Sequence, residues 1–193
     1  MAVTSANLVA GPATVYTGAF GATEPAASAV ATVPSSAAWT DIGGTDGGVK
    51  INIDLDYFDL SVDQITDRVG SRLSKREITV ETNLAENTLA NLKMAINGGT
   101  ITASAAYQTF DPLNDSSATQ PSYTAVIIDG WAPLGTLSAS ASARRRFIVR
   151  KVLNTDAVGV SYEKDKQTFI PVKLTAHYVS GTVGPFAVHD QLQ

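Results

Sequence analysis

A glycine-dense turn that leads directly into an alternating segment constrains this chain most strongly. Residues 39–48 read Trp-Thr-Asp-Ile-Gly-Gly-Thr-Asp-Gly-Gly, and residues 49–56 then alternate apolar and polar side chains. Alternation with a period of two is typical of a half-buried β-strand. Because the glycines precede a strand and not a helix, they lack the helix N-terminus that would hold a phosphate. The pattern therefore predicts a tight turn at the start of a long strand.

The alternation extends to Val62, but its phase changes on the way. The apolar positions are odd-numbered from Val49 to Leu55 and even-numbered from Phe58 onward. A one-residue shift of this kind indicates a β-bulge, here near Tyr57.

The segment after Val62 is polar. Residues 63–75 contain several charges and Gly70, whereas Ile78 and Val80 alternate again within residues 76–82. We expect a long hairpin whose tip is a long polar loop over residues 63–75.

One helix is expected next. Asn83 is a good N-cap, and Glu86 follows three residues later, as in a capping box. An apolar stripe at helical spacing follows, and Gly98 and Gly99 end it. The stripe consists of Ala85, Leu89, Leu92 and Ile96.

The other predicted elements are strands. Residues 8–16 and 123–129 favour single strands, and residues 146–153 and 158–163 a hairpin. The last strand covers residues 167–178, and Pro171 makes it an edge strand or a bulged one. The sequence therefore predicts a mainly β fold of the α+β class: an antiparallel β-sandwich or open barrel with one flanking α-helix and extended terminal arms.

The terminal segments differ in composition from the middle. Residues 1–38 carry one charged side chain, Glu24, and are rich in small residues. Disordered segments are usually charged, so an arm that lies on a neighbouring copy explains this composition better than a disordered tail. We expect an N-terminal strand and arm (1–38), a β-sandwich domain (39–179) and a C-terminal arm (180–193).

Composition argues against several functions. The net charge is −4, whereas nucleic-acid binding needs a surplus of Lys and Arg. The chain has no cysteine, which excludes disulfides and Cys-based metal sites. We see neither a signal peptide nor an apolar run of about 20 residues that would span a membrane.

Catalytic and cofactor motifs are missing from the sequence. His177 and His189 have no second ligand at metal spacing and are interpreted as structural. No nucleophile elbow, P-loop or dinucleotide fingerprint occurs. We therefore expect a non-enzyme without a cofactor or metal.

Two charged clusters each have an ordinary structural interpretation and a functional one. Asp54 and Asp56 belong to a run of five aspartates on an extended segment, which favours a solvated acidic face over a calcium loop. A basic cluster lies nearer the C-terminus. Phe147 is the one aromatic residue between its basic residues, which favours a subunit-contact patch or a solvated strand over DNA readout. The cluster consists of Arg144, Arg145, Arg146, Arg150 and Lys151.

Taken in order, these motifs resemble the major tail tube proteins of long-tailed, siphovirus-type bacteriophages. The strongest part runs from the Trp39 turn to the expected helix, including Val62-Asp63-Gln64 and Leu84-Ala85-Glu86-Asn87-Thr88-Leu89. A second part runs from residues 146–149 through Tyr162-Glu163-Lys164-Asp165 to the last strand.

The resemblance implies a structural virion protein that assembles with itself. Six copies would form a ring, and stacked rings would form a tail tube through which DNA is ejected without specific binding. The implied partners are further copies of the chain, the tape measure protein, the tail terminator and baseplate-side tail proteins, with assembly in the host cytoplasm and no membrane.

Residue roles follow as hypotheses. The face with Asp54 and Asp56 would point at the lumen or a ring interface, and the arginine cluster away from the lumen. The hairpin loop would reach an adjacent ring and pair with basic residues there. The loop residues in question are Asp63, Gln64, Asp67, Arg68 and Arg72.

Two alternatives remain open at this point. The same architecture could serve as the inner tube of a contractile tail or secretion apparatus, which a neighbouring sheath protein would reveal. A surface adhesive or carbohydrate-binding β-sandwich would need an aromatic platform, but aromatic residues make up 7% of the chain and do not cluster. A hydrolase is less favoured still, for want of a nucleophile and base.

Overall fold

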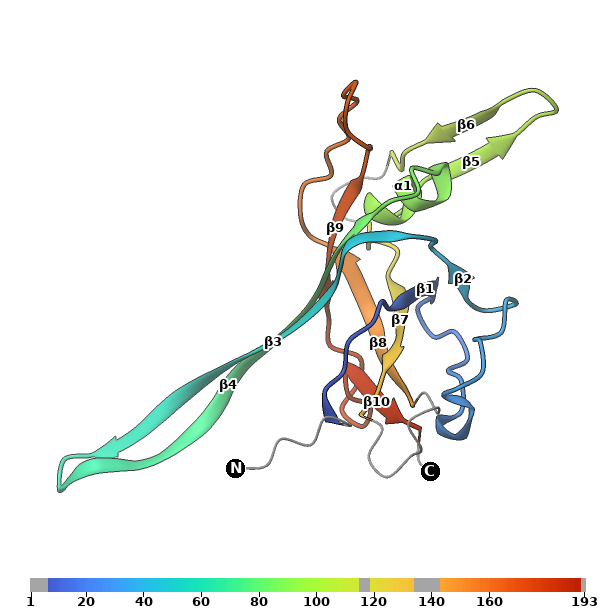
Figure 1. The fold of residues 1–193 in the computed structure, drawn as a ribbon. Helices are drawn as coiled ribbons and strands as arrows, with labels where there is room; N and C mark the ends of the chain where they lie inside the picture. Colours follow the sequence, from blue (N-terminus) through green and yellow to red (C-terminus); the bar gives the residue numbers. More distant parts are fainter. Residues whose placement is uncertain (1–6, 115–118, 134–142, 192–193) are drawn as a thin grey trace.

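The computed structural model describes residues 7–114, 119–133 and 143–191, and its main feature is an antiparallel sheet (Figure 1). The sheet has eight strands in the order β2-β1-β7-β8-β9-β4-β3, with β10 also paired to β8. They are β1 (Thr14–Ala19), β2 (Thr40–Asp41), β3 (Thr45–Val62), β4 (Ile65–Leu84), β7 (Thr124–Trp131), β8 (Arg144–Asn154), β9 (Ile170–Ala176) and β10 (Phe186–Asp190). A second sheet pairs β5 (Thr100–Ala103) with β6 (Gln108–Asp111), and the helices in the described ranges are the 3₁₀ helix η2 (Ala27–Ala29) and α1 (Leu89–Ala95).

One continuous apolar core joins most of the main sheet. Val15 of β1, Val126 of β7, Val149 of β8, Val80 of β4 and Val172 of β9 belong to the same buried cluster, which Ala95 of α1 also joins. Within the described ranges the strands form no closed barrel. The fold is thus mainly β, with antiparallel sheets and, among the described residues, one α-helix, which is consistent with the predicted β-sandwich.

The opposite face of β1, β7 and β8 is covered by the chain before β2. Tyr16, Ile127 and Ile148 pack there against Trp39. The indole Nε1 of Trp39 donates a hydrogen bond to the carbonyl oxygen of Thr23 (2.9 Å). The described part of the N-terminal segment therefore lies on its own sheet, and residues 1–6 fall outside the described ranges.

The first strand is displaced from its predicted position. It covers Thr14–Ala19 and not residues 8–16. Gly11 and Pro12 interrupt the earlier residues, and Pro12 has no N–H to donate to a ladder. β1 pairs with β7 over its whole length, from Thr14 opposite Asp129 to Ala19 opposite Thr124.

The predicted loop over residues 63–75 is wrong. β4 begins at Ile65, so the hairpin turns at Asp63 and Gln64, and most of the expected loop is strand. The predicted bulge near Tyr57 is confirmed, because the register shifts between Asp56 and Tyr57. Ser74 of β4 takes up that shift as an extra residue, since Asp56 lies opposite Lys75 and Tyr57 opposite Leu73.

The helix starts later than predicted. Asn83 lies in β4 opposite Asp46, and the N-cap of α1 is Thr88, whose Oγ1 accepts a hydrogen bond from the N–H of Asn91 (3.1 Å). Glu86 turns back to accept a hydrogen bond from the N–H of Gly44 (3.1 Å). The expected capping box of Asn83 and Glu86 therefore does not form, and Glu86 instead fastens the glycine-dense turn to the helix entry.

The predicted hairpin of residues 146–153 with 158–163 is also wrong. β8 pairs with β7 along one edge, while β10 and β9 share its other edge, so no edge remains for residues 158–163. The last strand is confirmed in a shorter form, Ile170–Ala176. Pro171 lies opposite Asn83 of β4, beyond the part of β9 that pairs with β8, which agrees with the predicted edge position.

The C-terminal segment contributes a strand that the arm interpretation did not include. Phe186–Asp190 forms β10, which pairs with β8 from Val149 to Arg145. Residues 192–193 fall outside the described ranges.

Candidate functional site

The hairpin of β3 and β4 projects from the body as a two-stranded ribbon (Figure 1). β9 pairs with β4 only as far as Thr79, so in the described structure residues 65–78 of β4 have β3 as their sole neighbouring strand. At about 3.3 Å per residue, this ribbon extends roughly 45 Å. Most of the residues that were expected to form a loop here are instead part of this strand-built arm.

The arm exposes large apolar side chains to solvent. The two most exposed are aromatic neighbours: Tyr57 is 58% exposed and Phe58 is 64% exposed. Monomeric proteins rarely leave large contiguous apolar patches in water, and such patches commonly mark contact sites. The exposed set on the arm is Ile53, Leu55, Tyr57, Phe58, Val62, Ile65, Val69 and Leu73.

The arm carries apolar groups on both faces. Successive side chains of a strand point to opposite faces, so Ile53, Leu55 and Tyr57 share one face of β3. Phe58 and Leu60 lie on the other face, opposite Arg72 and Gly70 of β4. The change of phase read from the sequence is therefore a change of apolar face along the arm.

A ladder of charges occupies the face of Asp54 and Asp56. Asp54 lies opposite Glu77 and Asp56 opposite Lys75, and Lys75 pairs with Glu77 (Nζ to Oε2, 2.6 Å). The hydrogen bond from Lys75 lowers the pKa of Glu77, and the same contact raises the pKa of Lys75. The face is mixed in charge, because Lys75 lies beside these carboxylates.

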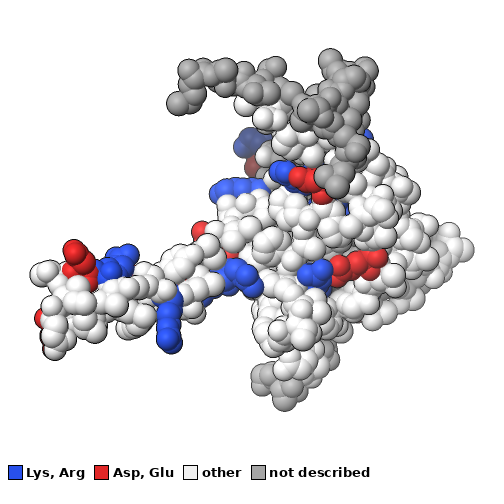
Figure 2. Space-filling model, turned by 90° about the horizontal axis from the view of Figure 1, so that it is seen from below, with Lys and Arg blue, Asp and Glu red and all other residues white. Residues whose placement is uncertain are grey.

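Charges of both signs also lie near the tip of the arm. Arg68 forms an ion pair with Asp59 (2.6 Å), and Ser71 donates a hydrogen bond to the same carboxylate (3.2 Å). Figure 2 shows the arm as a largely uncharged surface with a few acidic and basic groups. Asp63 and Gln64 form the turn, and Asp67, Arg68 and Arg72 lie on β4, so the five predicted loop residues are all exposed on the arm.

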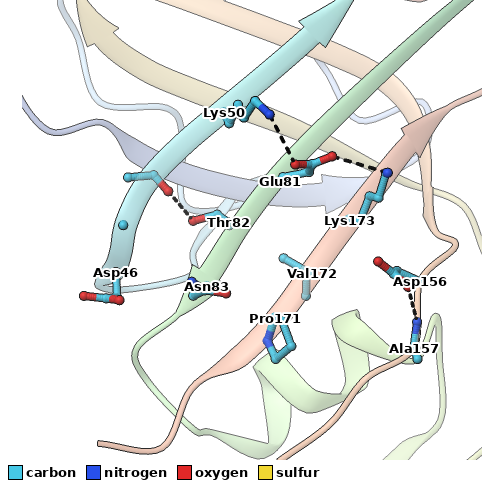
Figure 3. Close-up of a pocket in the computed structure, with 12 residues that line it drawn as sticks. Asp46, Lys50, Glu81, Thr82, Asn83, Asp156, Ala157, Pro171, Val172 and Lys173 are labelled. Carbon is cyan, nitrogen blue, oxygen red and sulfur yellow. Dashed lines mark hydrogen bonds and ion pairs between the residues drawn. The ribbon is translucent and has the colours of Figure 1, made fainter.

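A polar cavity of about 440 Å³ lies where the arm joins the body (Figure 3). Glu81 binds two lysines across its mouth, Lys173 at 3.3 Å and Lys50 at 3.9 Å. Thr82 donates a hydrogen bond to the carbonyl of Gly48 (2.9 Å), which fixes the glycine turn. The lysines are thus held by Glu81, and the described residues that line the cavity include neither a histidine nor a nucleophile–base pair.

The arginine cluster on β8 is engaged within the chain. Arg144 stacks on the ring of Trp131 (4.0 Å), and Arg145 binds both oxygens of Asp190 (2.6 Å each). Arg150 binds Glu24 (2.6 and 3.0 Å) and the carbonyl of Gly184 (2.8 Å).

Arg146 is fully buried, although sequence reasoning placed it in a surface patch. It binds Asp129 of β7 and the carbonyls of Ala29 (3.3 Å) and Thr32 (2.7 Å). The cluster therefore joins β8 to both terminal segments. Arg146 shares its strand face with buried Ile148, and that spacing was the signal that could have indicated its burial.

The remaining candidates for chemistry lie apart. His177 contacts the ring of Tyr123 edge-on (5.2 Å between centroids), while His189 lies in β10 opposite Arg146. In the described ranges, no group of three or more His, Asp or Glu side chains is placed to hold a metal ion. Nor does any helix in those ranges have the length and apolarity to cross a membrane.

Comparison with known families identifies the family of the chain that carries this arm. A family model described as "Phage tail tube protein" matches residues 1–183. The chain belongs to the phage tail tube protein family. A search of curated proteins found no match. As a member of this family, the chain is a structural component of the phage tail, and the family is not an enzyme family.

Proposed function

We propose that six copies of this tail tube protein form a ring and that stacked rings form the tube of a siphovirus-type tail, through which DNA is ejected. The observation that carries this proposal is the β3–β4 arm. It exposes apolar side chains on both of its faces, in a chain that belongs to the tail tube protein family. Burial of apolar surface contributes about 25 cal/mol per Å², so these side chains favour docking on further copies. The arm's reach is comparable to the diameter of a small domain, so it suits contact between rings.

Open strand edges support closure into a ring. β3 ends the main sheet, and its outer edge is unpaired in the described chain. A long free edge is an aggregation hazard unless another strand covers it. Heterologous contacts that close by rotation remove such edges, which favours a ring over an isolated copy.

The charge arrangement supports a conduit that does not retain DNA. Basic side chains on an inner wall would bind phosphates and slow passage. The four arginines of β8 already have partners within the chain, so they are unsuited to that role. In our proposal the mixed face with Asp54 and Asp56 points at the lumen or a ring interface, and the β8 arginines point away.

The same proposal covers the partners. The tube ends would contact the tail terminator and the baseplate-side proteins, and the lumen would hold the tape measure protein before DNA passes. Assembly would take place in the host cytoplasm.

Negative-stain microscopy of the purified protein tests the proposal. We expect six-fold rings or hollow rods from the intact chain. A variant in which residues 57–73 are replaced by a short glycine turn should still melt cooperatively but form no rods. Single globules at every concentration, with or without other tail proteins, would contradict the proposal.

The role of the tip charges has its own test. Exchanging Asp63 and Asp67 for Lys should block growth of rods without unfolding the chain. Rods of unchanged length would remove these residues from the ring contact. A density map with Arg144, Arg145 or Arg150 on the inner wall would overturn the assignment of the lumen face.

A further inference from the structure

An apolar cleft lies between the two terminal segments on the body. Its floor is formed by Trp39, Ala125 and Ile148, all of which are buried, and its volume is about 370 Å³. Phe20 lines it from the N-terminal side and Val183 from the C-terminal side. The ion pair of Glu24 with Arg150 lies at its rim, and the Glu24 side chain remains 34% exposed.

The arm carries a pair of side chains that matches this cleft. Phe58 and Arg72 lie directly opposite each other on β3 and β4, so they project from the same face. Phe58 is 64% exposed, and no ion pair links Arg72 to another described residue. Aromatic and arginine side chains are both enriched in protein interfaces.

Charge and apolar character agree between the two surfaces. The cleft would take the Phe58 ring, since aromatic side chains gain most when they fill a desolvated pocket. Arg72 would then approach Glu24 at the rim. Arg150 does not saturate this carboxylate, because it donates one hydrogen bond to each oxygen of Glu24 and a carboxylate has about four acceptor positions.

The occupant of the cleft must come from another copy. The arm leaves the body and points away from it (Figure 1), so Phe58 does not reach the cleft of its own chain. We propose that the Phe58–Arg72 face of each arm docks into the cleft between Phe20 and Val183 of a neighbouring copy. This rests on the proposed tube function and names the contact that the arm makes.

Disulfide trapping tests the contact directly, because the chain contains no cysteine of its own. We would combine Phe58→Cys with Val183→Cys and oxidise assembled rods. A disulfide requires Cα atoms about 4.4–6.8 Å apart, so only close docking gives a ladder of covalent multimers. The matched control is Tyr57→Cys with Val183→Cys, since Tyr57 is similarly exposed but lies on the opposite face.

The expected result is a ladder for the Phe58 pair and loss of the ladder for the Tyr57 pair. Rods that give no Phe58–Val183 ladder, or equal ladders for both pairs, would overturn this contact while leaving the tube function intact. A disulfide within one copy, seen as a monomer of altered mobility in dilute protein, would overturn it as well. Failure of the unmodified chain to form rings or rods under all conditions would instead remove the tube function.

A second test fills the cleft and leaves the arm unchanged. Val183→Trp should occupy the space meant for Phe58 and abolish rod formation, with unfolding at an unchanged denaturant midpoint. Val33→Trp is the control, because Val33 is 72% exposed and does not line the cleft. Rods from the Val183→Trp variant in normal yield would contradict the proposed docking.

Discussion

Both carboxylate oxygens of Asp129 accept hydrogen bonds from Arg146, at 2.6 Å from Nε and 2.6 Å from Nη2. Arg146 is fully buried, and its guanidinium also reaches two carbonyls of the segment that covers the sheet, those of Ala29 and Thr32. Because the charges are neutralised and hydrogen-bonded, the pair is tolerated inside the protein. It joins β7, β8 and the N-terminal segment at a single point.

Removing one partner should leave an uncompensated buried charge. We expect Arg146→Met or Asp129→Asn to lower the free energy of unfolding by about 3–5 kcal/mol, measured by urea denaturation. Arg145→Met is the control, because its pair with Asp190 is partly exposed and should be worth no more than about 1 kcal/mol. Similar losses for Arg146 and Arg145 would contradict the structural role assigned to the buried pair.

The pair of Arg145 with Asp190 should respond to pH. The hydrogen bond from Arg145 lowers the pKa of Asp190, so its folded-state value lies below the unfolded value of about 3.9. The stabilisation is therefore present above the unfolded pKa and is lost as the pH falls through the folded pKa.

The measurement is the difference in unfolding free energy between the wild type and Asp190→Asn as a function of pH. It should be constant and at most about 1 kcal/mol near neutral pH, because both groups are partly exposed, and should shrink in acid. In the Arg145→Met background the difference should vanish at all pH values. A difference that persists there would show that Asp190 acts through another group.

Asn154 provides another prediction, because its side chain links three segments. Its Nδ2 donates to the carbonyl of Ala95 at the end of α1 (2.6 Å), and its Oδ1 accepts from the N–H of Lys173 in β9 (2.9 Å). Asn154→Leu should lower the free energy of unfolding by about 1–3 kcal/mol for each buried group left unpaired. Thr155→Val, which removes an exposed contact with Thr175, should be close to neutral; comparable losses would argue against the role of Asn154.

Two glycines form a matched pair for backbone substitution. Gly43 has φ +82° and Gly21 has φ +84°, so alanine at either site adopts a left-handed conformation that costs about 1–2 kcal/mol. A Cβ at Gly43 would also overlap the carboxylate of Glu86, which holds the N–H of Gly44, whereas a Cβ at Gly21 meets open space. Gly43→Ala should therefore shift the thermal midpoint further down than Gly21→Ala. Equal shifts would mean that Glu86 moves aside without loss.

The sequence was informative where one face of an element is buried. The alternation from Val49 and the change of phase at Tyr57 predicted both the strand and its bulge, because the strand packs one face on the core before it leaves the body. The alternation of apolar and polar residues does not reveal the strand over residues 65–75, because neither face of β4 packs on the chain itself there. The charged residues of this segment suggested a loop instead. The helix start was misplaced because Asn83 is held in β4 by strand pairing that a local capping motif does not reveal.

Long-range partners were the main omission. Nothing in the Phe186–Asp190 segment distinguishes a free arm from a strand, because the edge that receives it lies on β8. The arginine cluster was likewise read as surface, since Asp129 and Glu24 lie far from it along the chain. The spacing of residues within a strand shows which side chains share a face. It does not show which distant carboxylate will pair with an arginine on that face.

The slenderness of the β3–β4 ribbon bears on when a tube starts to grow. A two-stranded ribbon without a third strand or a covering layer is marginally stable in water. In the proposed tube, the arm would complete its ordering when it contacts another copy, and the conformational entropy lost then would raise the barrier to the first encounter between free copies. The end of an existing tube, whose arms are already ordered, would avoid that cost. Elongation at such an end should therefore be faster than spontaneous nucleation. Free subunits can then accumulate without premature polymerisation.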